Sequence, residues 1–276
     1  MLSLILGILT RILSNSYINL FQKILTNKKE YSSVINFYTY FGLTIIGAII
    51  CSNLFFTEKI LFDVLIMGFL GALGNYFIIK ALSSGELSTL APINSYKPIV
   101  ALIFGYFLLQ EIPNFIQIIG IFLIILGTFH LGNTKLFYNK AVLYRFLALI
   151  FSGTEAIFIK KVILHTNIST AFLYWALAGL FFSAIFLLAT KHSLKIQKTS
   201  IKYQLVLIVL VALMQYSTNY VFSKMNVAYA LALFQLSTII SVFLGANVFK
   251  EKELTRKLLA SFIMILGAII IIIKKF

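Results

Sequence analysis

Charged residues are scarce in this 276-residue chain. They make up 11% of the sequence, whereas about 25% is usual in soluble domains. Only eight are acidic, and apolar residues account for 61%. A soluble protein of this size has no interior large enough to hide such an excess of apolar side chains. The composition therefore excludes an ordinary soluble domain and predicts a chain that crosses a bilayer.

The usual signatures of catalysis and cofactor binding are missing from the sequence. There is no Gly-Lys-Ser/Thr phosphate-binding loop, and no His-x-x-His or paired-carboxylate pattern lies in an apolar run. The single cysteine, Cys51, excludes an intramolecular disulfide. We therefore predict a protein that is not an enzyme and that binds no cofactor and no metal.

A separate basic domain is also missing, although the net charge is +15. The lysines gather in short stretches between apolar runs, such as residues 26–30 and 191–202. Basic loops beside membrane spans are typical of membrane proteins, whereas a nucleic-acid site needs a continuous basic surface. The charge therefore predicts no nucleic-acid partner.

The apolar residues that remain fall into runs of about 20 residues, the length that a helix needs to cross a membrane. These runs are continuous rather than alternating, as expected for helices. The sequence predicts ten transmembrane helices, at Leu4–Leu25, Ser32–Ser52, Ile60–Leu82, Leu87–Leu109, Pro113–Leu131, Ala141–Leu164, Thr170–Thr190, Tyr203–Met225, Ala228–Phe249 and Leu254–Lys274.

An internal repeat divides these ten runs into two sets of five. Three blocks recur in order, at offsets of 138, 144 and 140 residues: Ser14 and Lys23 with Ser152 and Lys161, then Asn75-Tyr76 and Lys80 with Asn219-Tyr220 and Lys224, then Gly105, Glu111 and Leu126-Gly127 with Gly245, Glu251 and Leu266-Gly267. An odd number of spans per half makes the second half enter from the opposite side, as in many transporters. The predicted fold is an all-α integral membrane protein of two inverted five-helix repeats, residues 1–138 and 139–276.

The end of each repeat resembles an EamA domain of the drug/metabolite transporter superfamily. The matching residues are the run from Gly105 to Glu111 with Gly120 and Ile124 to Gly127, and in the second copy Gly245 to Glu251 with Ile265 to Gly267. Residues 14–23 and 152–161 resemble the family's first helix, although its tryptophan-glycine pair is replaced by Ser14-Asn15 and Ser152-Gly153.

The resemblance implies a secondary transporter with a central cavity between the repeats and a small-molecule substrate. It implies alternating access, with export of a metabolite as the leading direction. The alternatives are uptake, flipping of a lipid-linked precursor, or a receptor or assembly subunit without flux. We expect a multi-pass protein of the cytoplasmic membrane, in contact with lipid, a monomer or homodimer, with proton coupling possible. The distribution of Lys and Arg places both termini outside the cytoplasm, whereas the resemblance implies that they lie inside.

Two local features of the spans are also informative. Pro92 and Pro98 both fall in the fourth span, where each removes a backbone donor. They predict a kink or break that either exposes backbone groups to a cavity or is filled by packing. Glu111 and Glu251 stand just before a span, where we expect each to cap the positive end of the helix that follows it.

Three charged residues are expected at mid-depth in the spans: Arg11, Lys97 and Glu155. An unpaired charge at the bilayer centre costs about 2.5–3.5 kcal/mol. We therefore predict that all three face the interior, with Glu155 paired to Lys97 or Arg11. They form either a substrate and proton site or a structural ion network in which Arg11 reaches toward the near surface.

The repeated Asn-Tyr pairs supply further candidates. Because lipid cannot satisfy their polar groups, we predict that at least one pair lines the central site; interhelical hydrogen bonding is the alternative. The complete predicted substrate-binding set is Arg11, Asn15, Asn75, Tyr76, Asn94, Lys97, Glu155, Asn219, Tyr220 and Gln235.

Overall fold

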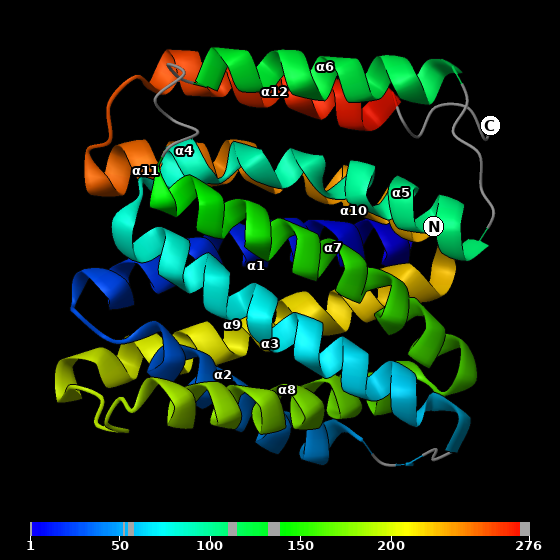
Figure 1. The fold of residues 1–276 in the computed structure, drawn as a ribbon, viewed down its shortest axis with the longest axis vertical. Coiled ribbons are helices and arrows are strands. Elements are labelled where there is room, and N and C mark those ends of the chain that lie inside the picture. Colours follow the sequence, from blue (N-terminus) through cyan, green and yellow to red (C-terminus); the bar gives the residue numbers. More distant parts are fainter. Residues whose placement is uncertain (1, 52, 55–57, 110–114, 132–138, 271–276) are drawn as a thin grey trace.

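The structure is a computed structural model that describes residues 2–51, 53–54, 58–109, 115–131 and 139–270. These residues form helices joined by short connections, with no strand among them (Figure 1). The helices are α1 (Leu2–Asn27), α2 (Ser32–Ile50), η1 (Glu58–Ile60), α3 (Leu61–Ser84), α4 (Leu87–Leu90), η2 (Pro92–Tyr96), α5 (Lys97–Leu109), α6 (Phe115–Leu131), α7 (Lys140–His165), α8 (Ile168–Thr190), α9 (Lys198–Lys224), α10 (Val227–Phe234), α11 (Ser237–Phe249) and α12 (Leu254–Ile270).

The all-helical membrane fold predicted from the sequence is confirmed in its main outline. Seven segments of the described chain are long and apolar enough to cross a membrane: α1, α2, η1 with α3, α7, α8, α9, and α10 with α11. The predicted fourth span is divided into α4, η2 and α5, and α6 and α12 have 17 described residues each. The total of ten spans therefore stays a prediction.

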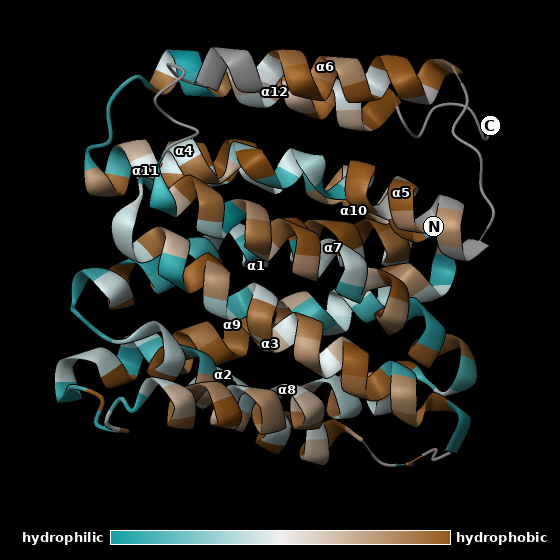
Figure 2. Cartoon of the chain, in the orientation of Figure 1, coloured by the Kyte–Doolittle hydropathy of each residue, from teal (hydrophilic) through white to brown (hydrophobic). Residues whose placement is uncertain are grey.

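The outer surface of the helical assembly is apolar. Large hydrophobic side chains such as Phe62, Phe122 and Leu188 are more than half exposed, which is unfavourable in water and favourable in lipid. Figure 2 shows hydrophobic residues along the helices and many hydrophilic residues toward their ends. Numerous polar side chains are instead buried between helices. This distribution fits a protein that spans a bilayer.

The helices of the two halves pack in matching pairs. α1 packs on α9 as α7 packs on α3, α1 contacts α11 as α7 contacts α5, and α2 packs on α8 and α6 on α12. In Figure 1, α1 starts at the right, beside the N label, whereas α7 starts at the left. The equivalent first helices thus run in opposite directions, as expected for an inverted repeat.

A lysine from the first helix of each half binds the end of that half's third helix. Lys23 of α1 donates from Nζ to the carbonyl oxygens of Leu82 and Gly85, both at 2.7 Å. Lys160 of α7 donates to the carbonyl oxygen of Phe222 near the end of α9. A cation there stabilises the negative end of the helix dipole. The sequence repeat had aligned Lys23 with Lys161, which instead lies 3.6 Å from Asp63.

The fourth span breaks where its prolines predict. Ala91 separates α4 from η2, and the amide of Asn94 bonds the carbonyl of Ala91 rather than that of Leu90. The carbonyl oxygen of Leu90 accepts instead from Nε of Arg145, at 3.1 Å. A buried arginine on α7 therefore satisfies a backbone group that the break releases.

The ninth span breaks at the equivalent place without a proline. The break separates α10 from α11 at Gln235 and Leu236. At the repeat offset of 140 residues, Gln235 corresponds to Ser95 in η2. The side-chain amide of Gln235 donates to the carbonyl of Leu231 at 2.5 Å, while its backbone amide bonds Ala232. The side chain thus occupies the carbonyl oxygen that the backbone amide of Gln235 would use in a continuous helix.

Candidate functional site

A cavity of about 90 Å³ lies between the two halves. Three pairs of equivalent helices form most of its wall, α1 and α7, α2 and α8, and α3 and α9, and Lys97 of α5 and Leu231 of α10 complete it. Its polar lining side chains are Arg11, Asn15, Asn19, Gln22, Thr39, Tyr40, Asn75, Lys97, Ser152, Glu155, Trp175, Gln215 and Thr218. The volume is several times that of one water molecule, so the cavity can hold a small solute.

The three charged residues expected at mid-depth all line this cavity. Arg11 on α1 and Glu155 on α7 are each 8% exposed, and Lys97 at the start of α5 is partly buried. The expected ion pair is not formed, since no salt bridge joins Glu155 to Arg11 or Lys97 in the described part of the chain. Glu155 accepts a hydrogen bond from the Trp175 indole Nε1 instead, at 2.5 Å.

Gly71 makes room for the contact between Glu155 and Trp175. A Cβ atom at Gly71 would lie 2.3 Å from Oε1 of Glu155 and 3.0 Å from Nε1 of Trp175. The ring of Trp175 also packs against Tyr40, with centroids 5.1 Å apart. Gly71 of α3 and Trp175 of α8 therefore hold the Glu155 carboxylate in position. The group that binds this carboxylate is the uncharged indole of Trp175.

Arg11 forms no salt bridge with an acidic residue of the described chain. Its guanidinium lies 4.8 Å from the centre of the Phe234 ring on α10, a cation–π contact. Its Nε and Nη1 atoms are buried and have no hydrogen-bond partner in the part of the chain that the structure describes. Arg11 also lines a side pocket of about 10 Å³ at the breaks of the fourth and ninth spans, with Asn15, Asn94, Lys97, Gln235 and Ser237 among its neighbours.

Amide side chains form a chain of hydrogen bonds along one wall. Gln22 donates to Asn75 at 2.9 Å, Asn75 donates to Asn36 at 2.7 Å, and Asn36 donates to the carbonyl oxygen of Ala72 at 3.1 Å. Gln22 and Asn75 line the cavity. The network joins α1, α2 and α3, so it fixes the first half of the wall.

The Asn-Tyr pairs are not placed alike. Asn75 lines the cavity, but neither Tyr76 nor Asn219 nor Tyr220 is in its lining. The Tyr76 hydroxyl lies 3.5 Å from Nζ of Lys80, Asn219 bonds Gln215 and the carbonyl of Ile168, and the Tyr220 hydroxyl donates to Ser3. Neighbouring residues of a helix point about 100° apart, so Asn75 faces the cavity while Tyr76 does not, and neither member of the second pair lines it.

Other lining residues were not predicted from the sequence. Trp175, Gln22, Asn19 and Gln215 all line the cavity. The available signal was a polar or indole group inside an apolar run, which has to find a partner within the protein. Trp175 is the only tryptophan of the chain, and its position within the predicted seventh span was the strongest sign.

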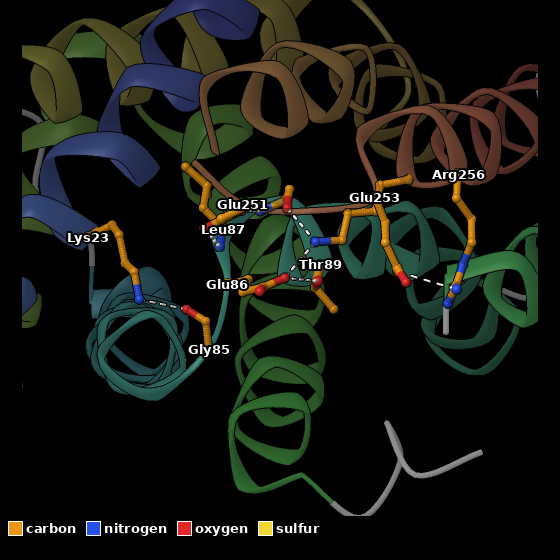
Figure 3. Close-up of polar contacts among 10 residues, drawn as sticks. Lys23, Gly85, Glu86, Leu87, Thr89, Glu251, Glu253 and Arg256 are labelled. Carbon is orange, nitrogen blue, oxygen red and sulfur yellow. Dashed lines mark hydrogen bonds and ion pairs between the residues drawn. The ribbon is translucent and has the colours of Figure 1, made fainter. Parts of the chain in front are cut away.

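A set of polar contacts joins the two halves, formed by Glu251 and Lys257 with Glu86, Leu87 and Ser88; Figure 3 shows Glu251, Glu86 and Leu87 among them. The Glu251 carboxylate accepts from the backbone amides of Leu87 and Ser88 at 2.8 and 2.7 Å. Lys257 donates to Glu86 at 2.5 Å and to the Ser88 hydroxyl at 2.8 Å. We call this set the inter-half clamp.

The clamp corrects the expected role of Glu251. Its carboxylate does cap a helix, but the helix is α4 of the first half rather than the following α12. Gly245 permits this approach, because a Cβ there would lie 2.5 Å from Oε2 of Glu251 and 2.8 Å from the Ser88 amide nitrogen. The equivalent expectation for Glu111 lies outside the described residues.

Comparison with solved structures shows the fold alone. A solved structure described only as "Crystal structure of protein" matches with a TM-score of 0.71 and 14% sequence identity, covering 97% of this chain and 96% of that one. In total 28 solved chains match. No curated protein matches the sequence.

The apolar helices that are long enough to cross a bilayer define a multi-pass membrane protein. The model of the EamA-like transporter family matches twice, over residues 2–132 and 139–273. The chain therefore belongs to the EamA-like transporter family, as its sequence motifs had indicated.

Proposed function

We propose that the protein is a secondary transporter of the cytoplasmic membrane that exports a small metabolite by alternating access. The observation that supports this most is the central cavity, because equivalent helices of both halves line it. A site at the interface of two repeats reaches one side or the other when one half rocks against its partner. In this proposal the repeats are residues 1–138 and 139–276.

The two broken spans give the proposal a structural basis. Both breaks lie beside the cavity, where Lys97 and Gln235 line the same side pocket. Discontinuous helices at mid-depth are a recurring feature of transporter sites, since backbone groups and helix ends become available to a solute. In our proposal the substrate-binding residues are Arg11, Asn15, Asn75, Asn94, Lys97, Glu155 and Gln235.

The inter-half clamp supplies a gate in the same scheme. Its hydrogen bonds join α4 of the first half to residues before and within α12 of the second half. Opening on that side has to break these contacts, and opening on the opposite side leaves them intact. Glu155 is the group we propose for proton coupling, because it is the acidic side chain of the cavity lining.

The test is a comparison of intracellular and extracellular metabolites in cells with and without the protein, followed by flux measurements in proteoliposomes. A solute that accumulates inside cells lacking the protein, and that the purified protein moves, supports export. Accumulation outside such cells indicates uptake, and movement of a lipid precursor between leaflets indicates a flippase. Specific binding without flux under any imposed gradient would identify a receptor and overturn the proposal.

A further inference from the structure

Positive charge exceeds negative charge around the cavity. Arg11 and Lys97 line it, with Glu155 as the acidic side chain of the lining. Arg145, 2% exposed, lies behind α4 and binds the carbonyl of Leu90. Because Glu155 is hydrogen-bonded to Trp175 and forms no salt bridge with these cations in the described chain, the surplus charge has no counter-ion of its own.

The buried guanidinium of Arg11 most clearly lacks hydrogen-bond acceptors in the described chain. The Arg11 side chain is buried, and its Nε and Nη1 atoms have no hydrogen-bond partner among the described residues. A guanidinium presents its donors in a fixed fork that matches the oxygen atoms of a carboxylate or phosphate. Leaving buried charged donors without a partner costs several times as much as an ordinary hydrogen bond contributes. The arrangement is therefore suited to an anion that the protein does not itself provide.

The neighbouring backbone adds to the same preference. Lys97 is the first residue of α5 and Ser237 is the first residue of α11, and both line the side pocket with Arg11. The first residues of α5 and α11 thus line one pocket, where the start of a helix favours negative charge, although the Lys97 amide already bonds the carbonyl oxygen of Asn94. Asn15 lies beside them and donates to the Ser237 hydroxyl at 2.9 Å.

We propose that the transported solute is an anion whose acid group, a carboxylate or a phosphate, binds between Arg11 and Lys97. This inference rests on the proposed transport function and adds the chemical class of the substrate. The rest of the solute extends through the main cavity, past Asn75 toward Trp175. Glu155 repels the acid group from the α7 side and so fixes the direction in which the solute lies.

The test is thermal unfolding of the full-length protein in detergent, with sodium acetate and sodium phosphate as probes. Sodium chloride at equal ionic strength and neutral acetamide are the controls. We expect acetate, phosphate or both to raise the unfolding temperature in a saturable way. Selective response to acetate assigns a carboxylate, and selective response to phosphate assigns a phosphate group.

Variants locate the effect. Arg11→Gln keeps hydrogen-bonding groups and removes the charge, and we expect it to weaken the anion response about tenfold or more. Lys97→Gln should act in the same direction, which provides a second measurement if one variant does not fold. Lys59→Gln is the matched control, because Lys59 is exposed in η1 and lies outside the cavity lining.

The result separates this inference from the transport proposal. If neither anion stabilises the wild-type protein beyond sodium chloride, or if Arg11→Gln and Lys97→Gln respond as Lys59→Gln does, the anion site is overturned. Flux of a neutral or cationic metabolite in that situation would leave the transport function standing. Saturable anion binding without flux under any gradient would instead confirm the site and refute transport.

Discussion

The carboxylate of Glu251, from the second half, accepts a hydrogen bond at 2.7 Å from the backbone amide of Ser88 in the first half. The same carboxylate also accepts a hydrogen bond from the backbone amide of Leu87, so one side chain satisfies two donors at the start of α4. An ionised acceptor makes such bonds stronger than neutral ones. Glu251 therefore stabilises the contact between α4 of the first half and the segment before α12 of the second.

Replacing Glu251 with Gln should weaken this junction. The amide retains one acceptor oxygen but loses the charge, so we expect a loss of about 1 kcal/mol, the usual contribution of a helix cap. Thermal unfolding and protease accessibility of the loop at residues 85–87 would measure it. Glu253→Gln is the control, since Glu253 pairs with nearby Arg256 at 3.3 Å, within the second half. Equal stability of the two variants would contradict a role for Glu251 as a cap between the halves.

The clamp should also depend on pH through Glu86. Burial by itself raises the pKa of this carboxyl, but the hydrogen bond and positive charge of Lys257 outweigh burial and hold the pKa below its ordinary value of 4.5. A carboxyl whose pKa is lower in the folded state stabilises the protein above its unfolded pKa and loses this contribution as the pH falls through the folded value. The stabilising effect of Glu86 is thus complete at neutral pH.

The measurement compares unfolding temperatures of the wild type and Glu86→Gln across pH. We expect the difference between them to stay constant from about pH 6 to pH 8 and to close only below the unfolded pKa. Glu58→Gln, at an exposed position of η1, corrects for the general effect of removing a carboxylate. A difference that disappears between pH 7 and pH 6 would rule out the ionised Glu86–Lys257 pair.

Gly71→Ala should disturb the position of Glu155. The added Cβ would lie 2.3 Å from the Glu155 carboxylate, so the carboxylate or the Trp175 indole has to move. Overpacking of this kind costs about 1–3 kcal/mol. Gly74→Ala on the same helix is the control, because its nearest contact would be 3.3 Å, to Ser152. Tryptophan fluorescence reports the change directly, since Trp175 is the only tryptophan; identical spectra for both variants would contradict the prediction.

Glu155→Gln tests the carboxylate itself. The amide preserves shape and can still accept from Trp175, so we expect the variant to fold and insert. If Glu155 couples transport to protons, flux should fall about tenfold, or about 1.4 kcal/mol, and lose its dependence on pH. Trp175→Phe, which keeps the charge but removes the donor, provides the comparison. Normal flux with normal pH dependence in Glu155→Gln would exclude a coupling role.

Hydrophobic run length was sufficient to place most of the helices. The run predicted at Ala141–Leu164 is α7, Lys140–His165, and the run at Thr170–Thr190 is α8, Ile168–Thr190. The break after Leu90 was also visible, because Pro92 lacks an amide donor. The break at Gln235 was not visible, because no proline marks it and only the structure shows the Gln235 side chain bonded to the carbonyl oxygen of Leu231.

What the sequence determined by itself was the membrane class, the repeat and the charged residues that lipid cannot solvate. These follow from the energy of transferring side chains and backbone groups into hydrocarbon, which depends on residue type and run length. Only the tertiary structure decided which groups bind one another. Glu155 bonds Trp175 rather than a cation, and Glu251 caps α4 rather than α12. Both lipid and protein neighbours favour apolar surface on a spanning helix. Hydropathy therefore does not show which helix each face meets, and the packing of the two halves settles it.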